Sequence, residues 1–169
     1  LYFPDFRATE RTFQLLTQVS GRAGRKHARG QVFIQTNYRH HHIFEMVENY
    51  DYEGFYESEV AERKTFHYPP FFRLIKISLK HKKAETVYQA AAVLKNLLLP
   101  TAGKRILGPA APTIARVRNQ YIQDIIIKVE RKTSVIQQIK STITDATTQV
   151  NKMSGMTTVR INIDVDPNG

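Results

Sequence analysis

The residues best suited to chemistry lie in one short segment, residues 18–25, which reads Q-V-S-G-R-A-G-R. Arg22 and Arg25 stand three positions apart, and each directly follows a glycine, Gly21 and Gly24 respectively. A guanidinium is planar and always charged, so it can contact several oxygens of a phosphoryl group during transfer, and glycine lets the backbone approach closely. The spacing therefore indicates an arginine-finger segment of a motor ATPase. The alternative is a basic, glycine-rich helix end that holds no ligand.

A helix is expected to position that segment. Asp5 can cap a helix start, and Phe13, Leu16 and Val19 then recur at helical spacing as far as Gly21. The arginine pair would fall in the last turn of this helix or just beyond it.

The next two elements are expected to be a strand and a second helix. Residues 31–36 are apolar and β-branched, which predicts a short strand, the last one of an α/β lobe. A polar stretch dense in histidine and tyrosine follows, and then a helix over residues 52–64. Phe55, Tyr56 and Val60 are its expected buried contacts.

A domain boundary is predicted at the double proline Pro69-Pro70, which stops a helix and biases Tyr68 toward extended backbone. Residues 1–66 hold 9 basic and 9 acidic residues, whereas the remainder holds 16 basic and 6 acidic ones. The sequence thus predicts two domains, residues 1–66 and 67–169. The positive second domain suits a polyanion such as nucleic acid, and a merely solvated basic surface is the alternative.

The second domain shows the element order β-α-β-β-α-β. Alternating apolar residues predict strands over 73–80 and 158–165, with two more, joined by a hairpin near Asn119, within 105–118 and over 125–129. Helical spacing predicts helices over 84–99 and 134–150. This is the ferredoxin-like α+β arrangement, in which both helices cover one sheet face and the other face stays open. Val159, Ile161, Ile163 and Val165 are expected to point inward.

The open face is expected to be basic, which suits phosphate backbones. Because it lacks stacked aromatic residues, we expect affinity without much base specificity. The candidate DNA contacts are Lys76, Lys80, Lys128 and Arg160, with Arg116 and Arg118 nearby.

Other patterns point away from further sites. The absence of cysteine excludes disulfides and thiolate metal ligation in this chain. Residues 40–42 are three consecutive histidines, whose side chains diverge, so a polar loop is the better interpretation than a metal site. Asp164 and Asp166 share a strand face and could bind a divalent cation or act as an acid–base pair, although a structural or solvated strand end is favoured. Gly103-Lys104-Arg105 does not complete a phosphate-binding loop.

No membrane segment is expected. The longest nearly apolar stretch, residues 90–100, contains Lys95 and Asn96 and is too short to span a bilayer. No signal peptide is visible, so a soluble, cytoplasmic protein is expected.

The chain carries several short motifs that point to one family. They are Phe3 to Ala8, Glu10-Arg11, Gln18 to Arg25, Gln35-Thr36, Asp51-Tyr52, Tyr68 to Phe71, Leu107 to Pro109 and Asp164 to Pro167. Together these motifs resemble the primosomal protein N′ (PriA) family of bacterial replication-restart DNA helicases. The resemblance implies superfamily 2 helicases with two RecA-like lobes, a cysteine-rich zinc-binding insertion and a C-terminal domain like a small-subunit ribosomal protein. This chain is similar to their C-terminal end.

The resemblance implies roles for the arginine segment. Arg22 and Arg25 match the fingers of helicase motif VI, which face ATP on the other lobe, and Gln18 matches its nucleotide-sensing residue, with Gly21 and Gly24 beside the nucleotide. ATP and Mg²⁺ would need that other lobe, and zinc would need the cysteine cluster. We therefore expect this chain alone to hydrolyse no ATP and to bind no zinc.

The resemblance also implies partners, namely forked and single-stranded DNA, single-stranded DNA-binding protein and primosome proteins. Arg131 and Lys132, ahead of the helix over 134–150, could receive an acidic peptide, and ordinary surface charge is the alternative. Tyr68 and Phe71 could stack on bases, although packing at the domain boundary is favoured. A competing interpretation of the whole chain is a non-catalytic module that binds nucleic acid or docks primosome proteins.

Overall fold

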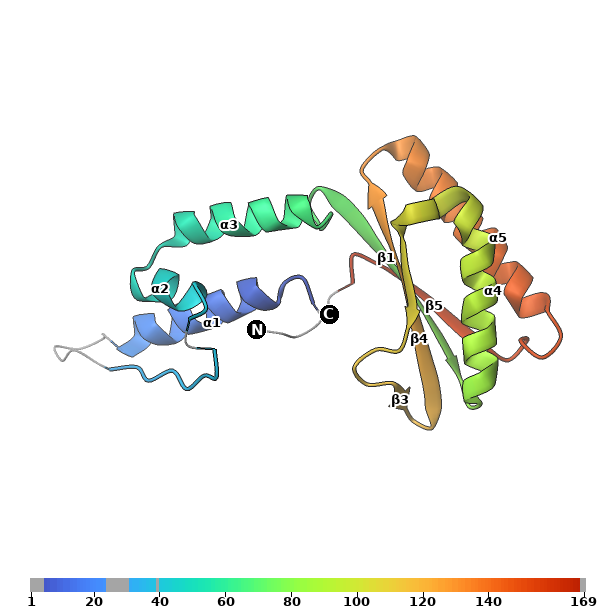
Figure 1. Ribbon diagram of the computed structural model, residues 1–169, viewed down its shortest axis with the longest axis horizontal. Coiled ribbons are helices and arrows are strands. Elements are labelled where there is room, and N and C mark those ends of the chain that lie inside the picture. The colour runs from blue at the N-terminus through green and yellow to red at the C-terminus, as the bar shows by residue number, and fades with distance from the viewer. Residues whose placement is uncertain (1–4, 24–30, 39, 168–169) are drawn as a thin grey trace. The chain divides into compact units, whose positions relative to one another are not determined.

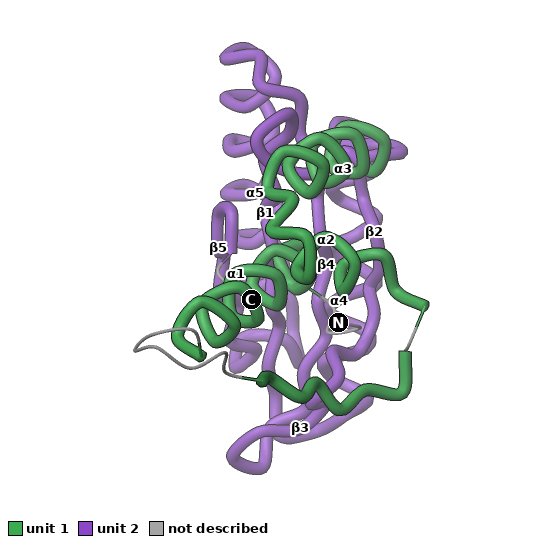
Figure 2. The backbone as a smooth tube through the Cα atoms, turned by 90° about the vertical axis from the view of Figure 1, so that its left-hand side faces the viewer, with its two compact units in different colours: residues 1–66, 169 green, residues 67–168 purple. Residues whose placement is uncertain are grey.

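The computed structural model of the chain describes residues 5–23, 31–38 and 40–167. The chain divides into two compact units, residues 1–66 and residues 67–168, which Figure 2 shows in different colours. Each unit has its own buried core. The two units are described separately below.

The first unit is helical in its described part. It contains α1 (Ala8–Ala23), α2 (Ile43–Glu48) and α3 (Tyr52–Thr65). Asp5 precedes α1, and its Oδ1 accepts the Arg7 N–H at 3.1 Å. Asp51 caps α3, where its Oδ1 accepts the Gly54 N–H at 2.9 Å. The two predicted helices are present, whereas the six-residue α2 lies in the polar stretch before residue 52, where no helix was predicted.

Four apolar side chains form the core of the first unit: Phe13, Ile43, Val47 and Phe55. The Phe13 and Phe55 rings stack with their centroids 4.0 Å apart, so α1 and α3 meet through aromatic packing. The expectation that Tyr56 is buried is wrong, because its side chain is exposed. Val60 is half-buried.

The strand predicted over residues 31–36 is absent. This segment forms no regular element, and Phe33 is 88% exposed. A strand is held by hydrogen bonds to a neighbouring strand. The described residues of the first unit include no other strand, so the β-branched run has a strand preference and nothing in this unit to pair with.

The second unit is one antiparallel sheet with helices, which confirms the predicted α+β class. The strand order is β2-β4-β1-β5, and β3 pairs with β4 (Figure 1). Its elements are β1 (Phe72–His81), α4 (Ala84–Ala102), the 3₁₀ turn η1 (Gly103–Arg105), β2 (Ile106–Ala110), β3 (Arg116–Val117), β4 (Gln120–Glu130), α5 (Thr133–Lys152) and β5 (Arg160–Val165).

The core of the second unit lies between the sheet and α4 and α5, which occupy the same side of the sheet in Figure 1. Ile75, Ile77 and Leu79 of β1 are fully buried there, as the alternation predicted. In β5 the prediction is only half right. Ile163 is 44% exposed and Val165 is 38% exposed, because the described helices leave the second half of this edge strand uncovered.

Gly108 explains one of the short motifs structurally. It lies in β2, where the register with β4 shifts between Leu107 and Ala110, and its φ is +93°. A Cβ at this position would lie 2.7 Å from the backbone oxygen of Asp124. Only glycine allows this approach without displacing β2 from β4.

Candidate nucleotide and nucleic-acid contact sites

The described part of the arginine segment lies at the end of α1. Gln18, Gly21 and Arg22 occupy its last two turns, and all three are exposed. Gln18 and Arg22 are four residues apart, so they lie on the same face of the helix. Gly24 and Arg25 lie outside the described residues. The helix therefore presents an amide and a guanidinium together to solvent, while Phe13 is buried in the core.

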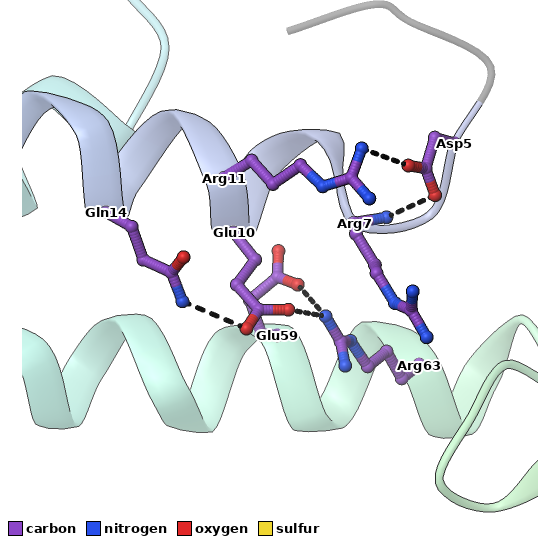
Figure 3. A network of polar contacts seen from close by, with 7 residues as sticks. All are labelled: Asp5, Arg7, Glu10, Arg11, Gln14, Glu59 and Arg63. Carbon is purple, nitrogen blue, oxygen red and sulfur yellow. Dashed lines mark hydrogen bonds and ion pairs between the residues drawn. The ribbon is translucent and has the colours of Figure 1, made fainter. Parts of the chain in front are cut away.

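A polar network fixes α1 to α3 (Figure 3). The Arg63 Nη2 lies 2.6 Å from the Glu10 Oε2 and 3.2 Å from the Glu59 Oε2, and the Gln14 amide donates to Glu10 at 3.2 Å. The Arg63 and Glu59 side chains are largely buried. Burial raises the pKa of Glu59, and the Arg63 guanidinium partly opposes that rise. Arg63 is thus the cation that two carboxylates share.

Replacing Arg63 with methionine should loosen α1 by about 1–3 kcal/mol, because two partly buried carboxylates would lose their cation. Amide hydrogen exchange of α1 measures this directly. Without Arg63, the folded-state pKa of Glu59 should rise further, so the native state binds more protons than the unfolded state above about pH 4.5. The stability deficit should therefore grow as pH rises and be smallest near pH 4.

Lys64 provides the matched control for that experiment. It is the next residue of α3, and its side chain is exposed. Lys64→Met should change stability by less than about 0.5 kcal/mol. Equal effects of Arg63→Met and Lys64→Met, or a deficit independent of pH, would contradict the shared-cation role of Arg63.

An ion pair occupies the centre of the open sheet face, at one of the predicted DNA contacts. Asp124 of β4 accepts a hydrogen bond from the Ser78 Oγ at 2.7 Å and forms an ion pair with the Lys76 Nζ at 3.0 Å. Asp124 is nearly buried, so this pair is held firmly. Lys76 consequently offers little charge to a phosphate. Along β4, Asp124 lies between Ile122 and Ile126 on the same, open side of the sheet. The two-residue alternation of β4 could have placed this carboxylate on the open face, but the sequence interpretation missed it.

Lys128 is also less available than the sequence indicated. Its Nζ lies 3.8 Å from the centre of the Tyr68 ring, a cation–π contact. Burial lowers the pKa of Lys128. Tyr68 therefore packs against the sheet through one ring face, in line with the favoured packing role rather than base stacking.

The other predicted cations gather at one end of the sheet. Lys80 of β1 and Arg160 of β5 are register partners at this end, and Lys82 and Lys83 form the turn that leads into α4. The hairpin between β3 and β4 adds Arg116 and Arg118. Within the part of the chain that the structure describes, none of the six forms an ion pair with a carboxylate. We call this set, Lys80, Lys82, Lys83, Arg116, Arg118 and Arg160, the basic end.

At the opposite end of the sheet, three arginines are engaged by nearby oxygens. Arg105 contacts Glu130 through two nitrogens, at 2.7 and 2.9 Å, and its hydrogen bond holds the pKa of Glu130 below its usual value. Arg73 lies 3.2 Å from Asp166. The Arg131 Nη1 donates to the Pro70 carbonyl at 3.1 Å. Lys132, the residue before α5, is exposed.

Asp166 closes the end of β5 on β1. Its Oδ1 accepts the Leu74 N–H at 2.9 Å, and its own N–H donates to the Leu74 carbonyl at 2.7 Å. With the Arg73 contact, both carboxylate oxygens of Asp166 have a partner within the sheet. Asp164 is exposed and lies opposite Lys76 in the register. The contacts of Asp166 support the favoured structural role for this residue.

Asp166→Ala should destabilise the second unit by about 1–3 kcal/mol, because the N–H of the buried Leu74 would lose its acceptor. Urea unfolding of the chain, monitored on β-sheet signal, measures this loss. Asp164→Ala is the control and should change stability by less than about 0.5 kcal/mol. A stability that depends on added divalent cations through Asp166 would contradict this role.

The histidine run shows local packing. The rings of His41 and His42 stack at 4.7 Å, and the His41 Nδ1 accepts the Ile43 N–H at 3.3 Å. Burial lowers the pKa of His41. Among the residues that the structure describes, no three histidine, aspartate or glutamate side chains are arranged to hold a metal ion. None of the described helices is both long and apolar enough to cross a membrane.

Comparison with known families matches residues 64–168, which include the whole sheet, to the Primosomal protein N C-terminal domain. The chain belongs to that family. Three relatives are each named "Replication restart protein PriA", and the match covers 99% of this chain in each. The chain is 36% identical to the Bacillus subtilis relative, and 37% identical to those of Synechocystis and Treponema pallidum. These matches confirm the family resemblance.

The chain spans only part of these relatives. It covers 20% of the length of the Bacillus subtilis protein, 19% of the Synechocystis protein and 25% of the Treponema pallidum protein. The family model begins at residue 64, close to the boundary between the two units. The family model does not cover the first unit, but the alignments with the three relatives extend over it.

Proposed function

We propose that this chain is the C-terminal part of an ATP-dependent 3′-to-5′ DNA helicase that restarts stalled replication forks through primosome assembly. The observation that carries the proposal is the alignment of nearly the whole chain with replication restart proteins. The exposed Gln18 and Arg22 on α1 and the basic end of the sheet supply contacts that such an enzyme needs. A cytoplasmic location is part of the same proposal.

In this proposal α1 carries the arginine fingers of a second RecA-like lobe. Arg22 and Arg25 contact the γ-phosphate of ATP bound on the first lobe, Gln18 senses the nucleotide, and Gly21 and Gly24 leave room for it. The guanidinium and amide groups fit phosphate oxygens. The guanidinium groups cannot ligate Mg²⁺, which prefers oxygen ligands. In this proposal Mg²⁺ is held with ATP on the first lobe.

Zinc does not fit this chain. It contains no cysteine, and the structure brings together no alternative ligand set among the described residues. A zinc site of the complete protein would accordingly lie in its cysteine cluster, outside this sequence. The isolated chain should neither hydrolyse ATP nor bind zinc.

The second unit is proposed to be a ferredoxin-like domain that contacts forked or single-stranded DNA. The strand order β2-β4-β1-β5 and the helices on one sheet face support that fold. The basic end supports phosphate contact, because its cations have no carboxylate partner in the described structure. Lys76 and Lys128 are left out of this interface, since Asp124 and Tyr68 engage them.

A protein-docking role is the second candidate, favoured by the uncovered apolar residues Ile163 and Val165 on the edge strand β5. Single-stranded DNA-binding protein and primosome proteins are the proposed partners, and Arg131 and Lys132 would receive an acidic peptide. Docking and DNA contact can coexist, because these apolar residues lie toward the opposite end of β5 from Arg160.

Salt dependence distinguishes DNA contact from docking. We expect the chain to bind forked DNA with an affinity that falls steeply with salt, by a log–log slope of about −0.9 for each phosphate neutralised. Fluorescence anisotropy over a salt series measures the slope. Weak, salt-insensitive DNA binding together with retained affinity for primosome proteins would instead support the docking module.

A further inference from the structure

The hairpin between β3 and β4 is an arm that extends past the rest of the sheet. Tyr121 pairs both with His81 of β1 and with Arg116 of β3, whereas Gln120 pairs only with Val117. The turn that precedes Gln120 therefore lies beyond the end of β1, and Figure 2 shows β3 at one extremity of the second unit. We call residues 114–121 the arm.

The arm has a well-defined tip. Its turn residues, Arg118 and Asn119, have φ values of +48° and +62°, the pattern of a two-residue type I′ hairpin. The Arg116 guanidinium donates a hydrogen bond to the Asn119 side chain. It also lies 4.9 Å from the centre of the Tyr121 ring. One of the two arm cations is thus held in place before any partner binds.

The chemistry of the arm suits a polyanion. No aspartate or glutamate occurs between Glu85 and Asp124, so the arm carries Arg116 and Arg118 with no acidic residue of its own. Two apolar side chains accompany them: Ile114 is 68% exposed and Val117 is 43% exposed. Exposed cations beside exposed apolar groups match a nucleic-acid groove, which offers phosphates at its rims and apolar sugar and methyl surfaces inside.

We propose that the arm enters the major groove of duplex DNA, an inference that rests on the proposed DNA-contacting function. A two-stranded ribbon has strands about 4.8 Å apart before side chains are added. It fits the major groove, which is about 12 Å wide, and not the minor groove, which is about 6 Å wide. In the groove Arg116 and Arg118 would meet guanine edges or phosphates.

A single strand is the less suitable partner for the arm. Sequence-tolerant binding of single strands depends on aromatic rings on which bases stack. Tyr121 is the arm's aromatic residue, and its ring packs against the core on the helix side of the sheet and lies under the Arg116 guanidinium. Lys80 and Arg160, on the strands beside the arm, are placed to meet the phosphates that flank the groove.

Dimethyl sulfate footprinting of a bound duplex tests the inference, because the reagent methylates guanine N7 in the major groove and adenine N3 in the minor groove. The chain should protect guanine N7. The variant Arg116→Gln with Arg118→Gln should lose this protection and bind duplex at least about tenfold more weakly. Its affinity for single strands should change less.

Two controls separate groove contact from folding of the arm. Arg118→Asn suits the left-handed turn position and removes one cation while Asn119 still accepts from Arg116, so it should weaken duplex binding while preserving the hairpin. Arg105→Gln removes a cation that is paired with Glu130 at the far end of the sheet and should leave the footprint unchanged. Unchanged thermal unfolding would show that all three variants are folded.

Several outcomes would overturn the arm's role. Protection of adenine N3 alone, an equal loss of single-strand and duplex affinity, or a footprint that survives both arm variants would contradict major-groove entry while leaving DNA contact intact. Loss of primosome-protein capture with an unchanged footprint would reassign the arm to protein docking. A wild-type chain that binds no duplex at all would contradict both the inference and the proposed DNA contact.

Discussion

Arg25→Ala in the complete protein is expected to lower ATP turnover by about 10³-fold or more, with DNA affinity changed by less than about twofold. The reason is that a finger stabilises charge that develops only on the transferring phosphoryl group, so its loss falls on the chemical step. Arg22→Ala should act in the same direction, since Arg22 extends from the last turn of α1 into solvent. Steady-state ATPase assays with saturating DNA measure both variants.

Arg11 is the matched control on the same helix. It is an exposed arginine of α1, but its ion pair with Asp5 accounts for its charge locally. Arg11→Ala should leave turnover within about twofold of the unmodified protein, because Arg11 lies in the first turn of α1, where Asp5 engages its guanidinium, and not in the arginine segment. Normal hydrolysis by Arg25→Ala, or equal losses for Arg11→Ala and Arg22→Ala, would contradict the finger assignment.

The second large effect is expected at the basic end. Replacing Lys80, Lys82, Lys83 and Arg160 together with glutamine should reduce the steepness of the salt dependence by about 0.9 for each phosphate that is no longer neutralised. Affinity at low salt should fall by roughly 10²-fold or more for the four substitutions combined. Anisotropy titrations of forked DNA over a salt series give both quantities. ATP turnover at saturating DNA should be retained.

Lys76→Gln with Lys128→Gln is the matched control for the basic end. The Asp124 carboxylate engages Lys76, and the Tyr68 ring covers Lys128, so their removal should barely change the slope. If this pair of substitutions lowered the slope as much as the four-residue variant, the open face and not the basic end would be the DNA-binding surface.

The sequence was most informative where local periodicity determines burial. Two-residue alternation identified Ile75, Ile77 and Leu79 as the buried side of β1, because one sheet face is covered by helices along the whole strand. The same rule overestimated burial at Ile163 and Val165, since alternation gives the face of a strand but not the extent of the helices above it.

Cross-strand neighbours could not be predicted in the same way. Lys76 and Asp124 are far apart in the sequence, and only the register of β1 with β4 brings them together with Ser78. When each strand is considered alone, the open face of the sheet is expected to be basic. The structure shows that its central cation, Lys76, is paired with a carboxylate of the neighbouring strand. The clustering of Lys80 with Arg160 depends on register as well, because β5 joins β1 from the end of the chain.

Segment 31–36 shows a third limit. Its apolar, β-branched residues have a strand preference, yet a strand needs a neighbour to satisfy its backbone. In the described part of the first unit no such neighbour exists, and Phe33 is exposed. Helix α1 did not face this limit, because its backbone hydrogen bonds are internal to the helix.

Single-turnover hydrolysis by the complete protein carrying Arg22→Ala and Arg25→Ala tests the central claim most directly, because it separates ATP binding from cleavage. With enzyme in excess over ATP and DNA present, nucleotide should still bind, within about tenfold of the unmodified affinity, while cleavage of the bound ATP should slow by about 10³-fold or more. Cleavage at the unmodified rate would contradict the claim that this chain supplies the arginine fingers of a DNA helicase.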